Sequence, residues 1–375
     1  MKRALIFAAL LTTMPAWAQV EKIIIPAGTP EDKAVQAVTA ENDPQKRLAL
    51  WQDFLQKFSS NPQAVAFGNW QLSQLYLDQG DFVKSLEYGD KALAAQPNNL
   101  DILVSVASAA QRMKNNGKIV DCAVRGGTAF NGIARQAKPA GMEDDAFALK
   151  IQQDQDPWRN TYEYLEAAGL NAITAEQDAK LRMGYIERFM GSFPNSRLQE
   201  QTMQMAVYTL AQLKDSQRLS QFAEKALAAD PNGMSTLVVL AVAFTEFPDP
   251  AFATRGEGYA HKALALPRAQ TKLDDNQYNF YSGMAHSALG YALMTQDKTL
   301  PGIAELKTAT TELKGHSDAY ATAVFRLGFA YAKTGKLAEA KAALTEAASI
   351  QSPYQNAARE LLGKVNAAAA KGRAK

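Results

Sequence analysis

Hydrophobic residues recur at three- and four-residue spacing along nearly the whole chain, which is the period of one face of an α-helix. Leu50, Phe54 and Phe58 are one example. The alternation typical of strands is confined to residues 23–25, which Pro26 ends. Between the apolar positions stand mainly Ala, Gln, Glu and Lys, all strong helix formers. The pattern therefore predicts an all-α fold.

The clearest pattern lies near the C-terminus, where two helical faces flank Gly335. A glycine there can adopt the left-handed conformation that ends a helix. Gly328 and Ala340 are small, so two antiparallel helices can approach closely, and larger side chains fill the space beside them. The first face comprises Val324, Leu327, Gly328 and Tyr331, and the second comprises Leu337, Ala340, Leu344 and Ala347.

This segment resembles a tetratricopeptide repeat, a helix-turn-helix unit of about 34 residues. A second match lies in residues 72–97 and its flanks, and it departs from the family pattern twice. Asn69 occupies the position where the family has a large aromatic residue, and Trp70 follows one position later. Gly89 occupies a position that is usually bulky. The resemblance implies a right-handed α-solenoid with two strong repeats and several degenerate ones. The second match carries Leu72, Ser73, Tyr76, Gly80, Phe82, Ser85, Ala92, Leu93 and Pro97; weaker copies contain Ala226 and Leu227, Ala263 and Leu264, and Leu289 and Gly290.

Two blocks of sequence also recur in the same order, which favours an internal duplication. Phe54 and Phe58 are matched by Phe189 and Phe193, 135 positions later. Residues 92–97 are matched by residues 226–231, 134 positions later. Chance similarity between Ala- and Leu-rich helices is the alternative.

These observations divide the chain into seven predicted segments. The first segment is a predicted signal peptide, and the last is a basic, Ala-rich tail. The segments are a signal peptide (1–18), an extended linker (19–36), a first helical repeat region (37–135), a divergent helical connection (136–171), a second repeat region that duplicates the first (172–266), C-terminal repeats (277–364) and the tail (365–375).

The first residues predict export. Lys2 and Arg3 precede a short apolar stretch, and small residues stand before a cut between Ala18 and Gln19. This is the pattern of a secretory signal peptide. No later apolar run approaches the length of about 20 residues that spans a membrane. The expected location is therefore outside the cytoplasm, in a bacterial periplasm or as a secreted protein, with no membrane-embedded part.

Composition argues against several classes of function. The chain has 40 Lys and Arg against 38 Asp and Glu, and the excess of two lies in the predicted signal peptide, so a nucleic-acid partner is not expected. The three histidines share no metal-ligand spacing, no serine stands in a Gly-x-Ser-x-Gly motif, and no glycine cluster follows a strand. We therefore expect neither catalysis nor a metal or cofactor. The acidic residues at 143–145 fit a helix start, and Cys122, the single cysteine, is expected to be buried or to form an intermolecular disulfide.

With these classes not expected, the remaining candidate for function is a binding surface on the helices. In tetratricopeptide proteins the first helix of each repeat lines a concave groove, so the resemblance implies a scaffold or assembly adaptor of the cell envelope that binds a protein partner. An aromatic and amide lining suits a peptide. One alternative is that these side chains only pack against neighbouring repeats. Another is that the protein is a periplasmic binding protein for an envelope glycan or small ligand. The candidate groove residues are Trp70, Gln74, Asp78, Gln204, Tyr208, Gln212, Phe325, Phe329 and Lys333.

Overall fold

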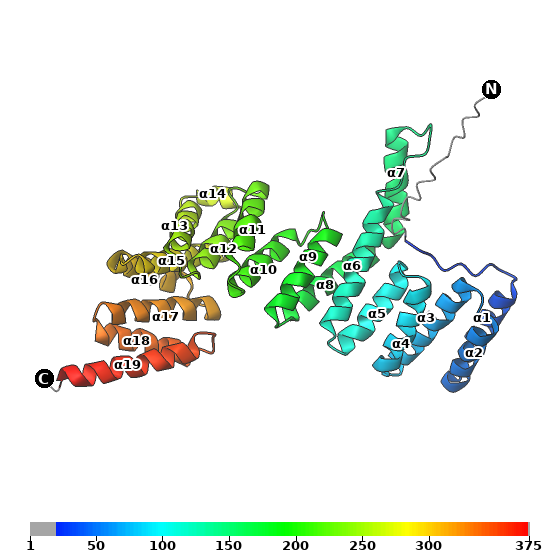
Figure 1. Cartoon of the computed structure of the whole chain (residues 1–375), viewed down its shortest axis with the longest axis horizontal. Helices are drawn as coiled ribbons and strands as arrows, with labels where there is room; N and C mark the ends of the chain where they lie inside the picture. Colours follow the sequence, from blue (N-terminus) through cyan, green and yellow to red (C-terminus); the bar gives the residue numbers. More distant parts are fainter. Residues whose placement is uncertain (1–19, 374–375) are drawn as a thin grey trace, which may run out of the picture. The chain divides into compact units, whose positions relative to one another are not determined.

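The computed structural model describes residues 20–373, and every regular element in that range is helical. Many helices that follow one another in the chain pack against each other (Figure 1). This confirms the predicted all-α fold built from helical hairpins. The predicted signal peptide, its cleavage site at Ala18 and Gln19, and the last two residues of the predicted basic tail lie outside the described residues.

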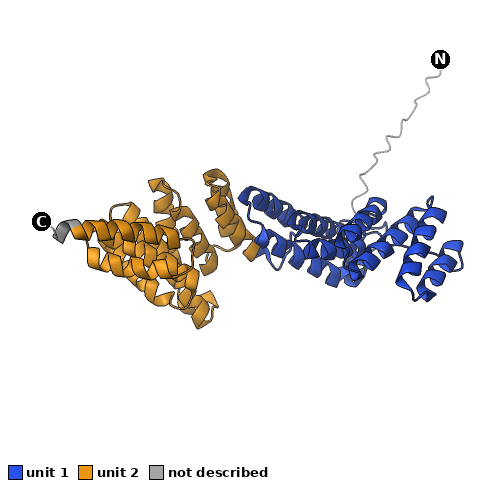
Figure 2. Cartoon of the chain, turned by 90° about the horizontal axis from the view of Figure 1, so that it is seen from below, with its two compact units in different colours: residues 1–199 blue, residues 200–375 orange. Residues whose placement is uncertain are grey.

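The chain forms two compact units, residues 1–199 and 200–375 (Figure 2). Their boundary falls inside the segment 172–266 that the sequence suggests as one region. The first unit contains α1 (Pro30–Ala40), α2 (Pro44–Lys57), α3 (Pro62–Asp78), α4 (Phe82–Ala95), α5 (Leu100–Arg112), α6 (Asn116–Ile133), α7 (Asp144–Gln155), the 3-10 helix η1 (Asp156–Trp158), α8 (Arg159–Ala175) and α9 (Ala179–Ser192).

The second unit contains all but the first residue of α10, which begins at the boundary, and the helices that follow it. Each of the two units has its own buried core, formed mainly by Leu, Ala, Val and Phe side chains. The helices are α10 (Gln199–Gln212), α11 (Ser216–Ala229), α12 (Met234–Thr245), α13 (Pro250–Leu264), α14 (Arg268–Thr271), α15 (Asp275–Thr295), α16 (Thr299–Glu312), α17 (Ser317–Lys333), α18 (Leu337–Ser349) and α19 (Gln355–Arg373).

The segment predicted as an extended linker, 19–36, is only partly extended. Its first residues lie along the first unit, where the Ile24 amide donates to Gln63 Oε1 at 3.1 Å. Helix α1 then begins at Pro30, so the prediction was wrong for the second half of the segment. Thr29 accepts a hydrogen bond from the Asp32 amide and Pro30 occupies the first helical turn, two strong helix-start signals. The apolar pattern did not reveal this helix because only Val38 of it is buried.

Five hairpins are closed by the same turn. A carbonyl near the end of the first helix accepts a hydrogen bond from the amide five residues later, and the residue before that amide has a positive φ. This is the Schellman motif, which favours glycine at the left-handed position. The left-handed residues are Gly80 (77°), Lys114 (54°), Lys214 (54°), Asp297 (61°) and Gly335 (74°), and the bonds join Asp81 to Tyr76, Asn115 to Ala110, Asp215 to Leu210, Lys298 to Leu293 and Lys336 to Tyr331, at 2.9–3.0 Å.

Close approach within the last hairpin depends on a glycine, as the sequence indicates. A Cβ at Gly328 would stand 2.8 Å from Leu344 Cγ, shorter than any normal contact. At Gly89, where the family usually has a bulky residue, a Cβ would stand 2.5 Å from Val106 Cγ2. Val106, on the next helix, therefore fills the space that a larger residue at position 89 would take.

Local hydrogen bonds repeat at the offset of the proposed duplication. Asp43 caps α2 and Asp178, 135 positions later, caps α9, each by accepting bonds from the two amides that begin its helix. The Arg47 side chain donates to the Glu41 carbonyl at 2.7 Å, and Arg182 donates to the Glu176 carbonyl at 2.9 Å. The rings of Phe54 and Phe58 lie 5.0 Å apart, and those of Phe189 and Phe193 lie 4.5 Å apart. Shared caps and ring pairs are stronger support for a duplication than similar Ala-rich sequence.

Cys122 is fully buried in the core of the first unit. Burial raises the pKa of its thiol to about 12, because the thiolate would lose its hydration. Of the two alternatives for this residue, the structure shows the buried one.

The left-handed turns predict opposite effects of two substitutions in the first unit. Gly80→Ala introduces a Cβ at positive φ and is expected to lower the free energy of unfolding by about 1 kcal/mol. Lys114→Gly removes the same strain and is expected to raise it by up to about 1 kcal/mol. Urea unfolding followed by circular dichroism measures both; a loss of stability in both variants would contradict this interpretation of the turn.

Candidate functional site: a cavity on the first helices of the second unit

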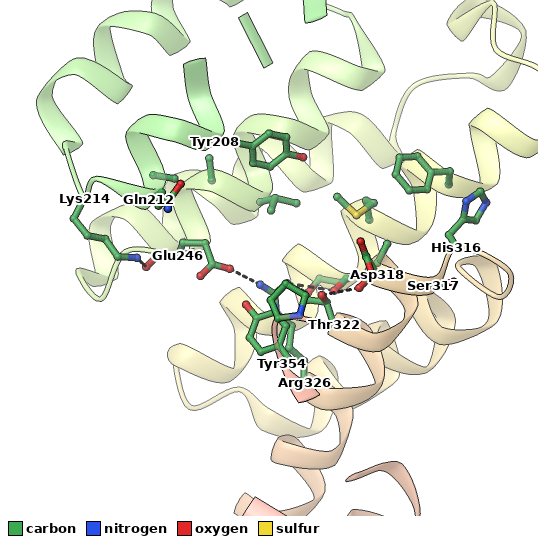
Figure 3. A pocket seen from close by; sticks show the side chains of 18 residues that line it. Tyr208, Gln212, Lys214, Glu246, His316, Ser317, Asp318, Thr322, Arg326 and Tyr354 are labelled. Carbon is green, nitrogen blue, oxygen red and sulfur yellow. Dashed lines mark hydrogen bonds and ion pairs between the residues drawn. The ribbon is translucent and has the colours of Figure 1, made fainter. Parts of the chain in front are cut away.

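The second unit contains a cavity of about 810 Å³. Its walls come from α10, α12, α15 and α17, and from the loop before α19 (Figure 3). Helices α10, α15 and α17 are the first helices of hairpins closed by the left-handed turn, and α12 is the first helix of the pair it forms with α13. The cavity is therefore lined by the faces that the repeat resemblance assigns to a groove.

Helical periodicity brings the lining residues together. Side chains three or four positions apart share one face of a helix. The walls from α10, α15 and α17 are built on that spacing. The lining residues are Tyr208, Ala211 and Gln212 on α10, Val242 and Ala243 on α12, Phe280, Met284 and Ser287 on α15, and Asp318, Thr322 and Arg326 on α17, with Lys214, Glu246, His316, Ser317, Ala319, Pro353 and Tyr354 completing the cavity.

Arg326 ties three of the walls together from a buried position. Only 4 % of the residue is exposed. Its guanidinium donates to Glu246 Oε1 at 2.7 Å and to Ser287 Oγ at 3.2 Å, and it lies 4.5 Å from the ring centroid of Tyr291. A buried charge of this kind is tolerated only with such partners. The Arg326–Glu246 pair thus fixes α17 against the end of α12 and the middle of α15.

Tyr208 and Tyr354 form aromatic walls. Burial raises the pKa of Tyr208 to about 12, although 40 % of the residue is exposed. Both observations fit a concave wall, where protein atoms surround the hydroxyl while solvent still reaches the side chain. Tyr354 stacks on Phe325, with ring centroids 5.0 Å apart and an interplanar angle of 23°. Burial also raises the pKa of Tyr354.

Charged groups lie at both ends of the cavity. At one end Lys214 Nζ donates to the Glu246 carbonyl at 2.7 Å and lies over the Phe247 ring. At the other end Asp318 occupies the first turn of α17, and the neighbouring His316 ring lies 4.9 Å from that of Phe280. Figure 3 shows these two ends on opposite sides of the Arg326–Glu246 pair.

The structure distributes the predicted groove residues of the second unit between several environments. Tyr208 and Gln212 line the cavity. Gln204, one turn earlier on α10, donates to Glu200 Oε1 at 3.1 Å. Phe325 lies behind Tyr354 as its stacking partner. On the following turns of α17, Phe329 is 42 % exposed and Lys333 pairs with Asp297 at 2.8 Å, and neither lines the cavity.

Two of the three predicted groove residues of the first unit face a neighbouring helix. Trp70 Nε1 and Gln74 Nε2 both donate to Ser105 Oγ on α5, at 2.8 and 3.2 Å. This is the packing alternative that the sequence leaves open for such residues. Asp78 is exposed at the end of α3. Binding of a glycan by Trp70 and Gln74 is therefore not favoured, because their polar groups already bond to Ser105.

Four charged residues of the cavity were not predicted from the sequence. Arg326 stands in the apolar run 323–328, and a charge inside such a run is the signal that could have revealed it. Glu246 stands two residues after the end of the longest apolar run, 237–244. Lys214 stands where the duplication aligns it with Gly80. Asp318 carries no sequence signal beyond its place in a first helical turn.

Within residues 20–373, no group of three or more His, Cys, Asp or Glu side chains is arranged to hold a metal ion. In the same range, no helix combines the length and the apolar character needed to cross a membrane. The acidic residues at 143–145 begin α7, as the sequence indicates, with Asp144 and Asp145 in its first turn.

Comparison with known proteins identifies the repeat. A family model described as "Tetratricopeptide repeat" matches residues 321–354, which cover most of α17, all of α18 and the loop that contributes Tyr354 to the cavity. The chain therefore contains a tetratricopeptide repeat at residues 321–354. No curated protein matches its sequence.

Several solved structures are similar to this chain at low identity. A tetratricopeptide repeat protein from Parabacteroides merdae has a TM-score of 0.40 and 13 % identity over 80 % of this chain and 98 % of that one. The APC/C Cut9–Hcn1 hetero-tetramer has 0.44 and 13 %, over 89 % and 62 %. Yeast Tom70 has 0.27 and 13 %, over 92 % and 95 %. All three TM-scores lie below 0.5, too low to support any inference about this repeat protein.

The buried pair predicts a large difference between two ion pairs of α17. Arg326→Leu leaves Glu246 without its partner and is expected to lower the free energy of unfolding by about 1–3 kcal/mol, because a partly buried carboxylate stays unpaired. Lys333→Met, which breaks the exposed pair with Asp297, is expected to cost under about 1 kcal/mol. Urea unfolding measures both. Equal losses in the two variants would show that Arg326 does not hold the walls together.

Proposed function

We propose that the protein is a non-catalytic scaffold that binds a segment of a protein partner in the cavity of its second unit. The observation that carries the proposal is the cavity itself, lined by α10, α12, α15 and α17. Tetratricopeptide-repeat proteins are generally scaffolds for protein interaction, and stacked repeats present extended concave surfaces.

The lining suits a peptide. The cavity volume lies within the range of about 300–1,000 Å³ typical of preformed binding sites. Tyr208, Phe280 and Tyr354 offer aromatic surface, which contributes much of the binding energy in many interfaces. Met284 also lines the cavity and can adapt its shape to a partner side chain. An extended or helical segment that inserts one or two apolar side chains fits this combination.

The glycan alternative has less support. Sugar recognition would need amide and hydroxyl groups directed into an aromatic cleft. Among the candidate groove residues, Gln74 bonds to Ser105 and Gln204 bonds to Glu200. Gln212 is the one candidate groove amide that lines the cavity.

The interaction is proposed to take place in the cell envelope, after export. The support is the N-terminal sequence, with its basic start, apolar stretch and small residues before Gln19.

Export predicts a processed N-terminus. Full-length protein expressed in a bacterium with a C-terminal tag is expected in the osmotic-shock fraction, with an intact mass that corresponds to a chain starting at Gln19. Lys2→Glu with Arg3→Glu removes the basic start and is expected to reduce the processed fraction severalfold. Unprocessed protein in the cytoplasm for both forms would rule export out.

The cavity predicts position-specific crosslinking. A photo-reactive phenylalanine analogue at Thr322, inside the cavity, is expected to capture a partner in cells, whereas the same analogue at exposed Lys341 on α18 is not. Ser317→Trp places a bulky ring at the cavity rim and is expected to lower the yield from position 322 at least fivefold. Ser60→Trp, at an exposed site in the first unit, is the matched control and should leave the yield unchanged.

Immunoblotting and mass spectrometry measure the captured product. A partner captured equally from positions 322 and 341, or one unaffected by Ser317→Trp, would show that binding occurs elsewhere on the protein.

A further inference from the structure

The cavity has charges of opposite sign at its two ends and an apolar wall between them. Lys214 marks one end and Asp318 the other, while Tyr208 and Tyr354 lie between (Figure 3). Both charged residues are exposed, so a bound segment can reach them.

The central charges are already paired. Arg326 is 4 % exposed and donates to Glu246 and Ser287. A buried guanidinium with these partners has little to offer a ligand, because binding would first have to break the pair. Recognition of charge is thus left to the two ends.

Each end retains bonding capacity. An ammonium has three donors, and the structure assigns one donor of Lys214 to the Glu246 carbonyl at 2.7 Å. That bond directs the side chain toward the cavity despite its exposed position. At the other end, a carboxylate accepts several hydrogen bonds, and Asp318 lies in the first turn of α17, which fixes its place on the rim.

We propose that the cavity binds a partner peptide with an apolar centre, an acidic residue toward Lys214 and a basic residue toward Asp318, and that these charges fix the direction of the bound segment. This rests on the proposed function, that the cavity binds a partner segment. A peptide in the reverse direction would place like charges together at both ends, a common source of specificity. Because both ends are exposed, the preference weakens at high salt.

The test uses a random dodecapeptide display library selected on the full chain, and in parallel on the charge-swapped variant with Lys214→Asp and Asp318→Lys. Aspartate tolerates the left-handed conformation at position 214. The unaltered chain is expected to enrich peptides with an acidic and a basic residue on opposite sides of an apolar centre, in one order. The swapped variant is expected to enrich the reverse order.

Single neutralising variants provide a second measurement that does not depend on the swapped chain folding. With the best enriched peptide labelled for fluorescence anisotropy, Lys214→Met and Asp318→Asn are each expected to weaken binding by about tenfold. Lys333→Met changes a residue outside the cavity, on the same helix as Asp318, and should leave the affinity for the peptide unchanged. Circular dichroism checks that each variant keeps its helix content.

The outcomes separate the two proposals. Peptides whose binding is abolished by Ser317→Trp but which show no charge order, or the same order on both chains, would overturn the directional proposal and leave the cavity as the binding site. Peptides that bind Ser317→Trp as well as the unaltered chain, or no enrichment at all, would overturn both.

Discussion

The left-handed turn that closes five of the described hairpins is the constraint on which the rest of the structure depends. It returns the chain antiparallel to itself within three residues, so that the second helix of a pair can bury its face against the first. At Gly80 and Gly335 the turn costs little, whereas Lys114, Lys214 and Asp297 adopt the same conformation with a side chain in place. Each turn also fixes the residue at which the first helix ends. This sets the rotation of that helix about its axis, and therefore which of its side chains face the concave side.

The cavity follows from that arrangement and from one buried ion pair. Helices α10, α12, α15 and α17 contribute side chains to one space, and α10, α15 and α17 end in the same kind of turn. Arg326 and Glu246 then bridge α17 and the end of α12. The same turn that closes α10 places Lys214 at the cavity rim. Fold and candidate site therefore share a residue.

The fold could be predicted from the sequence because it depends on short-range patterns. Gly335, Gly328 and Leu344 signal a hairpin within some twenty positions, and the structure places them in that hairpin. The site could be predicted only in part, since the partners of a groove residue come from other helices. Tyr208 was found because aromatic residues on a first helix are conspicuous. Trp70 has the same signal, yet Ser105, 35 positions away, accepts its hydrogen bond. Arg326 needed knowledge of Glu246, 80 positions earlier.

Cys122 has a consequence for the conditions under which the chain can fold. With its thiol fully buried, its pKa near 12 and no second cysteine in the sequence, the native state neither requires nor readily permits sulfur chemistry. The folded protein is therefore indifferent to the redox potential around it. The same structure is compatible with a reducing cytosol and an oxidising envelope, and no disulfide-forming enzyme is needed at any stage of its assembly.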